Sequence, residues 1–179
     1  MRNWIIPLAI LTLILAVSGC NEQQKSAEST AAQLPVKDLP GSIKYIGSPS
    51  YESVMSSIAR DYGNFSSAGK IVNASQGFYQ NKGSIDFNII VMKFQDKPAA
   101  ASFVEEFRSG YQEFPYESRF LEESFNGHSA LRIKYYAIER GRDEPRYLYI
   151  WSNGYLVFLV RGTSDDASLM LSLAKSTGN

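Results

Sequence analysis

Three segments near the C-terminus constrain the fold of this chain most strongly. Residues 131–139, 146–152 and 155–161 are rich in β-branched and aromatic residues and are separated by turn formers, a pattern typical of β-strands. Asn153 and Gly154, between the last two segments, are the strongest hairpin signal in the chain, because both tolerate positive φ. Tight turns join neighbouring strands of antiparallel sheets, so these segments predict such a sheet.

The rest of the chain from residue 41 adds helices and further strands. Apolar residues at helical spacing predict helices over 49–62 and about 96–111. A third helix follows Thr163, which with Asp166 resembles a capping box. Further strands are expected at 69–79, 84–94 and 116–124, with a short edge strand at 42–47. We therefore predict an α+β domain with an antiparallel sheet of about five to six strands and two to three helices packed mainly on one face.

Hairpin register predicts which side chains share a face of this sheet. A two-residue loop at 153–154 pairs Trp151 with Leu156, and a loop over 140–145 sets the register of the preceding strand. The aliphatic face, expected beneath the helices, comprises Leu131, Ile133, Tyr135, Leu148, Ile150, Val157 and Leu159. The opposite face comprises Arg132, Lys134, Tyr136, Tyr147, Tyr149, Trp151, Leu156 and Phe158.

The face that mixes cations with aromatic rings has two interpretations. As a wet surface it suits a protein or a hydroxyl-rich polymer, because Tyr and Trp offer apolar area with a polar group and cations stack on their rings. Alternatively, the aromatic residues form a second core layer beneath residues 41–47 or the preceding tether, and the cations extend to solvent. On the first interpretation the ligand-binding residues are Arg132, Lys134, Tyr147, Tyr149 and Trp151.

Residues 1–19 have the three parts of a secretory signal. Arg2 supplies positive charge, residues 4–17 are almost wholly apolar, and small residues precede Cys20. As a helix the apolar run is about 21 Å long, shorter than the ~30 Å hydrocarbon core of a bilayer. A permanent membrane-spanning helix is therefore the weaker interpretation.

The end of this segment, VSGC at 17–20, resembles the lipobox of prokaryotic lipoproteins. The resemblance implies that residues 1–19 are a signal peptide, that cleavage occurs just before Cys20, and that the Cys20 thiol receives a lipid carrying acyl chains such as palmitate. Two acyl chains are sufficient for stable anchoring. Cys20 is also the single cysteine, which excludes an intramolecular disulfide. An uncleaved anchor, or an ordinary signal peptide with a coincidental cysteine, is the alternative.

Residues 20–40 predict the lipidated cysteine followed by a flexible tether, because Gln, Ser, Ala, Glu, Thr and Pro dominate them. One folded domain then occupies residues 41–179, a length that supports a substantial core. Its last elements, an aromatic strand, an Asn-Gly turn, an apolar strand and a short helix, resemble the end of small archaeal envelope lipoproteins. That resemblance implies an envelope location and no particular activity.

The sequence gives no signature of catalysis or metal binding. Eighteen Lys and Arg balance eighteen Asp and Glu, so the basic surplus typical of nucleic-acid binding is absent from the composition. The single histidine, His128, follows a turn, and no phosphate loop, dinucleotide fingerprint or hydrolase motif is found. Glu122 and Glu123 are adjacent on a strand, so they point to opposite faces. We expect no catalytic residue, metal, cofactor or nucleic-acid partner.

The combined prediction is a non-catalytic lipoprotein on the extracytoplasmic side of the cell membrane, held there by its lipid. Its domain binds an unidentified envelope protein or polymer. An envelope glycan-acting enzyme with scattered acidic residues and a structural or accessory envelope protein are the alternatives. Asn64 and Asn73 also fit the N-glycosylation sequon, which applies if the host glycosylates exported proteins.

Overall fold

The structure is a computed structural model and describes residues 36, 38–82 and 85–179. The predicted signal peptide, Cys20 and nearly all of the tether lie outside the described residues. Within the described part of the chain, none of the helices has the length and apolar character needed to cross a bilayer.

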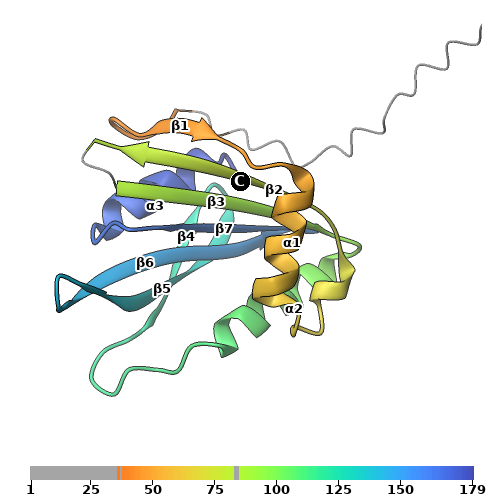
Figure 1. Cartoon of the computed structure of the whole chain (residues 1–179). Helices are drawn as coiled ribbons and strands as arrows, with labels where there is room; N and C mark the ends of the chain where they lie inside the picture. The colour runs from red at the N-terminus through yellow and green to blue at the C-terminus, as the bar shows by residue number, and fades with distance from the viewer. Residues whose placement is uncertain (1–35, 37, 83–84) are drawn as a thin grey trace, which may run out of the picture.

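An open antiparallel sheet of seven strands, in the order β1-β2-β3-β7-β6-β5-β4, forms the centre of the domain (Figure 1). The strands are β1 (Lys44–Gly47), β2 (Ile71–Asn81), β3 (Ile85–Phe94), β4 (Phe120–Phe125), β5 (His128–Glu139), β6 (Arg142–Asn153) and β7 (Leu156–Gly162). The helices are α1 (Tyr51–Tyr62), the 3₁₀ helix η1 (Ala68–Lys70), α2 (Lys97–Ser109) and α3 (Ala167–Ser176). The predicted α+β class is confirmed. The sheet exceeds the five to six strands expected, because the short edge strand β1 pairs with β2.

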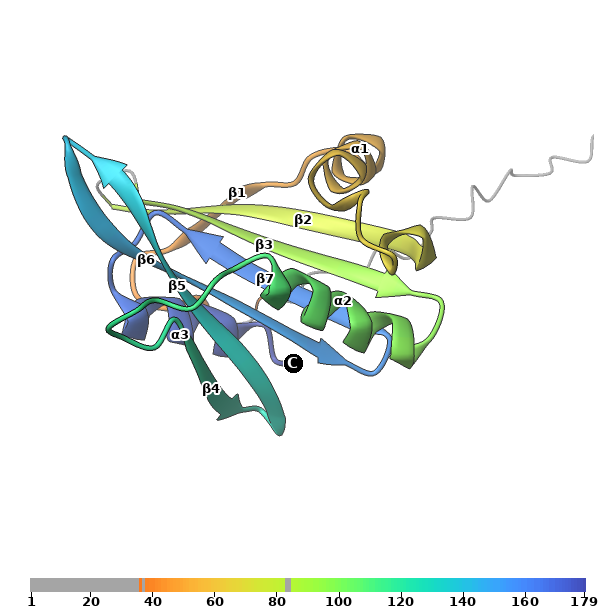
Figure 2. The same cartoon turned by 90° about the horizontal axis from the view of Figure 1, so that it is seen from below.

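Helices cover both faces of this sheet. As Figure 2 shows, α1 and α2 pack on one face and α3 packs on the other. The α1–α2 core joins Val54, Ile58 and Phe103 to the aliphatic face of the strands. The α3 core joins Met170 and Leu173 to the aromatic face. Two helices share a face, as predicted, and the third closes the opposite side.

Side-chain caps set the start of each of the three α-helices. Ser50, Asp96 and Asp166 each accept a hydrogen bond from a backbone N–H in the first turn of α1, α2 and α3, respectively. The predicted role of Thr163 as the cap of the last helix is wrong. Its hydroxyl instead accepts a hydrogen bond from the backbone N–H of Asp86, at 3.1 Å, and so joins β7 to β3.

The β6–β7 hairpin turns one residue later than predicted, so each residue of β6 pairs with a β7 residue two positions further along the chain. Its loop is Gly154–Tyr155, and Trp151 faces Phe158 rather than Leu156. Gly154 has a φ of +62°, the left-handed conformation that glycine adopts without strain.

The β5–β6 connection is a tight turn rather than the predicted loop over 140–145. Arg140 and Gly141 form it, with φ values of +51° and +76°, so Tyr135 faces Arg146 instead of Ile150. This partner shift of four residues and the shift of two in β6–β7 are both even. Side chains alternate along a strand with a period of two, so every residue stays on its predicted face.

The two helices on the α1–α2 face leave one end of the sheet uncovered (Figure 2). At that end, Phe78 of β2 faces Asn88 of β3, and Asn88 faces Arg161 of β7. These three side chains lie on the same face of the sheet as the α1–α2 core. Asn88 is two residues from Ile90, Arg161 is two residues from Leu159, and Phe78 is paired with Asn88. The face therefore changes from an apolar core to a polar and aromatic floor.

Candidate ligand-binding site

Two of the predicted ligand-binding residues are buried. Tyr149 and Trp151 are 0% and 1% exposed and belong to the α3 core. The Trp151 ring stacks on Phe158, with centroids 5.1 Å apart, and meets Phe125 edge-on at 5.3 Å. An exposed aromatic face is therefore wrong for these two residues, because α3 packs over them. The second-core interpretation is correct that these two residues are buried and that residues 41–47 contribute cover through Ile43, but the helix α3, which it did not include, packs over them as well.

Arg132, at the edge of the α3 core, is balanced by a carboxylate. Its Nη1 lies 3.4 Å from Oε1 of Glu123, and the Tyr149 hydroxyl donates to Oε2 of the same group at 2.5 Å. Burial, and then this hydrogen bond, raise the pKa of Tyr149 well above its usual range. The Arg132 guanidinium also lies 5.4 Å from the ring centroid of the partly buried Tyr147. These contacts make Arg132 and Tyr147 part of an internal network.

Lys134, the second predicted cation, also has a partner within the domain. Its Nζ donates to Oε2 of Glu117 at 2.6 Å, and the Tyr136 hydroxyl donates to Oε1 at 2.7 Å. The hydrogen bond from Lys134, followed by that from Tyr136, lowers the pKa of Glu117. The group fastens the segment before β4 to β5, which gives Lys134 a structural role.

The two predicted glycosylation sites differ in exposure. Asn64, just after α1, is exposed. Asn73 lies in β2 and is only 6% exposed. Since a glycan must extend into solvent, modification of Asn73 in the folded domain is wrong, whereas Asn64 stays a prediction.

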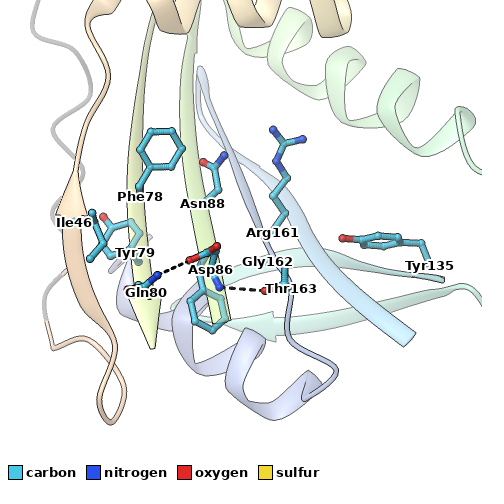
Figure 3. A pocket seen from close by; sticks show the side chains of 11 residues that line it. Ile46, Phe78, Tyr79, Gln80, Asp86, Asn88, Tyr135, Arg161, Gly162 and Thr163 are labelled. Carbon is cyan, nitrogen blue, oxygen red and sulfur yellow. Dashed lines mark hydrogen bonds between the residues drawn. The ribbon is translucent and has the colours of Figure 1, made fainter. Parts of the chain in front are cut away.

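An open pocket of about 510 Å³ lies at the end of the sheet that α1 and α2 leave uncovered (Figure 3). We name it the Arg161 pocket. Strands β1, β2, β3, β5 and β7 contribute to its wall. Its lining residues are Ile46, Phe78, Tyr79, Gln80, Asp86, Phe87, Asn88, Tyr135, Arg161, Gly162 and Thr163.

Arg161 supplies the positive charge of this pocket. Among the described residues it forms no ion pair within 4.0 Å. Burial raises the pKa of Tyr62, Tyr111 and Tyr135, and in each case the positive charge of Arg161 opposes part of that rise. Tyr135 lines the pocket together with Arg161, and all three phenols stay protonated at neutral pH, because an ordinary tyrosine already titrates near pH 10.

Asn88 places an unpaired hydrogen-bond acceptor in the floor of the pocket. Its Oδ1 is buried and has no hydrogen-bond partner among the described residues. Figure 3 shows Phe78, Asn88 and Arg161 pointing from three neighbouring strands to the same side, with Tyr135 directing its hydroxyl toward Arg161. A buried acceptor without a donor costs about 1–3 kcal/mol, so this oxygen favours a ligand that carries a donor.

Hydrogen bonds and one glycine fix the rim of the pocket. Asp86 accepts from Nε2 of Gln80 at 2.9 Å, and its backbone carbonyl accepts from the N–H of Thr163 at 2.9 Å. Gly162, next to Arg161, is crossed by the Phe87 ring, and a Cβ at this position would lie 2.6 Å from Cδ1 of that ring. Glycine is required here because two segments approach closely.

A second groove lies at the turn between β5 and β6. It also has a volume of about 510 Å³, and its lining residues are Glu139, Arg140, Arg142, Glu144, Arg146, Thr163 and Asp165. Arg146 is buried and pairs with Glu139. Acids and bases alternate in this groove, so it offers no single sign of charge to a ligand.

The three central residues of the Arg161 pocket were missed by sequence reasoning. Arg161 carried a usable signal, because it follows Leu159 by two positions on the face predicted to pack beneath the helices. A charge at such a position marks where the apolar core ends. Phe78 and Asn88 carried no such signal, since their distance from Arg161 depends on pairing between β3 and β7.

No group of three or more His, Cys, Asp or Glu in the described part of the chain is arranged to hold a metal ion. No protein-family model, curated protein or solved structure matches the chain. Function is therefore inferred from the chemistry of the site.

Proposed function

We propose that the chain is a membrane-anchored extracytoplasmic lipoprotein whose domain binds a ligand, without catalysis, in the Arg161 pocket. The observation that carries the binding role is a guanidinium in an open pocket without an ion-pair partner among the described residues. Cations drawn away from water are ordinarily paired with an acid of the same fold. A cation left unpaired in a concave site favours an anion from outside.

The lipobox-like end of the leader supports the anchoring role. Cys20 is the single cysteine and stands at the position that a lipid-modified residue requires. The composition of the segment that follows it, to residue 40, predicts a tether, and a flexible tether of that length would reach on the order of 25 Å. A tether of that reach would hold the domain clear of the lipid headgroups and leave the pocket accessible.

The acids near the pocket favour binding over glycan hydrolysis. Glycoside hydrolases use two carboxyl groups about 5–10 Å apart, one on each side of the scissile bond. Among the described residues that line the Arg161 pocket, Asp86 is the one acid, and it already accepts a hydrogen bond from Gln80. This arrangement offers a place for an anion and no carboxylate pair.

Lipid attachment is tested by Cys20→Ser. We expect the variant to lose labelled palmitate and to accumulate as unprocessed precursor, because serine lacks the nucleophilic thiol. Ser26→Ala, in the tether, is the matched control and should label like the wild type. Equal labelling and equal membrane fractionation of Cys20→Ser and wild type would contradict the anchor.

Ligand binding is tested with small-molecule extracts of the source cells. Fractions are screened for those that raise the Tm of the full-length protein in detergent, because a ligand that binds only the native state stabilises it. Asn88→Trp fills the pocket and should abolish the shift, whereas the exposed Tyr116→Ala should preserve it. Binding in this pocket is contradicted if every active fraction also stabilises Asn88→Trp.

A further inference from the structure

The chemistry of Arg161 favours a carboxylate as the anionic group of the ligand. A guanidinium presents parallel N–H donors in one plane, a geometry that matches the two oxygens of a carboxylate. Tyr135, which lines the same pocket and directs its hydroxyl toward Arg161 (Figure 3), supplies a further neutral donor. Asp86, which would repel an anion, is on the rim with its carboxylate engaged by Gln80.

The position of Asn88 favours a donor beside that carboxylate. Asn88 faces Arg161 directly across the β3–β7 ladder, and its buried Oδ1 lacks a donor among the described residues. Neighbouring strands are about 4.8 Å apart. A ligand whose carboxylate contacts Arg161 therefore lies next to Asn88, and an N–H near that carboxylate would pair with the Asn88 oxygen.

Beyond Asn88 the floor becomes apolar. Phe78 faces Asn88 across the β2–β3 ladder and is 42% exposed, and Ile46 of the edge strand β1 is also exposed. An exposed phenyl ring in a concave wall suits a flat or branched apolar group, which would bury area on both partners. From β7 to β2, the floor therefore presents a cation, a hydrogen-bond acceptor and an apolar wall.

We propose that the Arg161 pocket binds an apolar carboxylic acid with an N–H next to its carboxylate, the chemical class of N-acyl amino acids with a hydrophobic side chain. This inference rests on the proposed function, because it assigns a ligand class to the same pocket. In the complex Arg161 pairs with the carboxylate, Asn88 accepts from the amide N–H, and Phe78 contacts the side chain.

The test is calorimetric titration of the full-length protein in detergent with N-acetyl-L-phenylalanine. Its neutral amide, N-acetyl-L-phenylalaninamide, lacks the charge, and 3-phenylpropionate lacks the N–H. Wild type is expected to bind the acid saturably, about 10- to 100-fold tighter than the amide, because a hydrogen-bonded charge is lost in the amide. Binding of 3-phenylpropionate should be about 3- to 10-fold weaker than that of the acid.

The variants assign each preference to a residue. Arg161→Gln should abolish the preference for the acid over the amide, and Arg161→Lys should restore part of it, since lysine keeps the charge without the planar fork. Asn88→Leu should bind N-acetyl-L-phenylalanine and 3-phenylpropionate equally. Arg142→Gln, in the charged groove, is the matched arginine control and should behave like wild type. If Arg161→Gln fails to fold, the acid-to-amide ratio of the wild type decides alone.

Three results would overturn the ligand class: no saturable binding of the acid, equal affinity for acid and amide, or saturable binding of inorganic phosphate alone. Failure of the ligand class is distinguishable from failure of the proposed function. An extract fraction that stabilises wild type but not Asn88→Trp, together with no binding of the acid, retains the pocket and rejects the class. If no extract fraction stabilises the wild type over Asn88→Trp and the acid does not bind either, the pocket is rejected as a ligand site.

Discussion

Trp151→Ala measures whether the aromatic face of the sheet is a core layer. Trp151 is 1% exposed, stacks on Phe158 with an interplanar angle of 9°, and meets Phe125 edge-on. A buried Trp removes about 150–250 Å² from water, which at about 25 cal/mol per Å² is worth roughly 4–6 kcal/mol. Truncations of Phe or Trp to Ala typically cost about 3–5 kcal/mol, because the cavity left behind relaxes only in part.

One feature of Trp151 reduces this cost. Its Nε1 is buried without a hydrogen-bond partner among the described residues, so the wild type already bears an unsatisfied donor that the variant removes. We therefore expect Trp151→Ala to lower the free energy of unfolding by about 3–4 kcal/mol. Trp151→Phe, which keeps an aromatic ring against Phe158 and loses the donor, should cost about 1 kcal/mol or less.

The assay is urea unfolding followed by far-UV circular dichroism, which does not depend on the deleted indole. With an m value of about 2 kcal/mol/M, Trp151→Ala should move the midpoint down by roughly 2 M. Tyr116→Ala is the control, because Tyr116 is 97% exposed and its truncation should change stability by less than about 0.5 kcal/mol. If Trp151→Ala and Tyr116→Ala unfold at the same urea concentration, α3 does not bury this face, and the exposed aromatic surface returns as the better interpretation.

Two further substitutions test local contacts. Gly162→Ala should lower the free energy of unfolding by about 1–3 kcal/mol in urea unfolding, because its Cβ would lie 2.6 Å from the Phe87 ring and 2.8 Å from the backbone oxygen of Asp86; an unchanged midpoint would show that both neighbours move aside without cost. Glu106 accepts hydrogen bonds from Ser66 and Ser67, and these bonds, that of Ser66 first, lower its pKa. Its stabilising effect is thus full above the unfolded-state pKa of about 4.3 and is lost as pH falls through the lower folded-state value. The stability difference between wild type and Glu106→Gln should therefore shrink in acid, and a difference constant from pH 7 to pH 3 would exclude this linkage.

The division of residues between the two faces of the sheet could be predicted from sequence because it depends only on a period of two. Both hairpin registers were wrong, with Trp151 paired to Leu156 and Tyr135 to Ile150, yet both shifts are even and the faces survive. The residue types typical of turns did not fix the positions of these two hairpin turns. Gly141 carries the signal of a tight turn, and with it the β5–β6 register becomes predictable.

Coverage of the aromatic face could not be predicted from local patterns, because the side on which α3 packs depends on the path of the chain after β7. The cations on that face suggested a wet surface. Their partners were partly deducible, since the Asn126-Gly127 turn places Glu123 opposite Ala130, two residues from Arg132. A carboxylate so close to Arg132 already favours an internal pair.

Three cations that look alike in the sequence differ in whether the fold supplies them with a carboxylate partner. Arg132 and Lys134 stand among aromatic residues, and the fold supplies each with a carboxylate. Arg161 stands at the end of an apolar strand, and among the described residues the fold supplies none. A mixture of aromatic rings and positive charge therefore does not identify a binding surface, because internal pairing satisfies it equally well. The stronger criterion is a cation in a concave site whose counter-ion the chain does not provide, and applying it requires the pairing of β3 with β7 that places Asn88 beside Arg161.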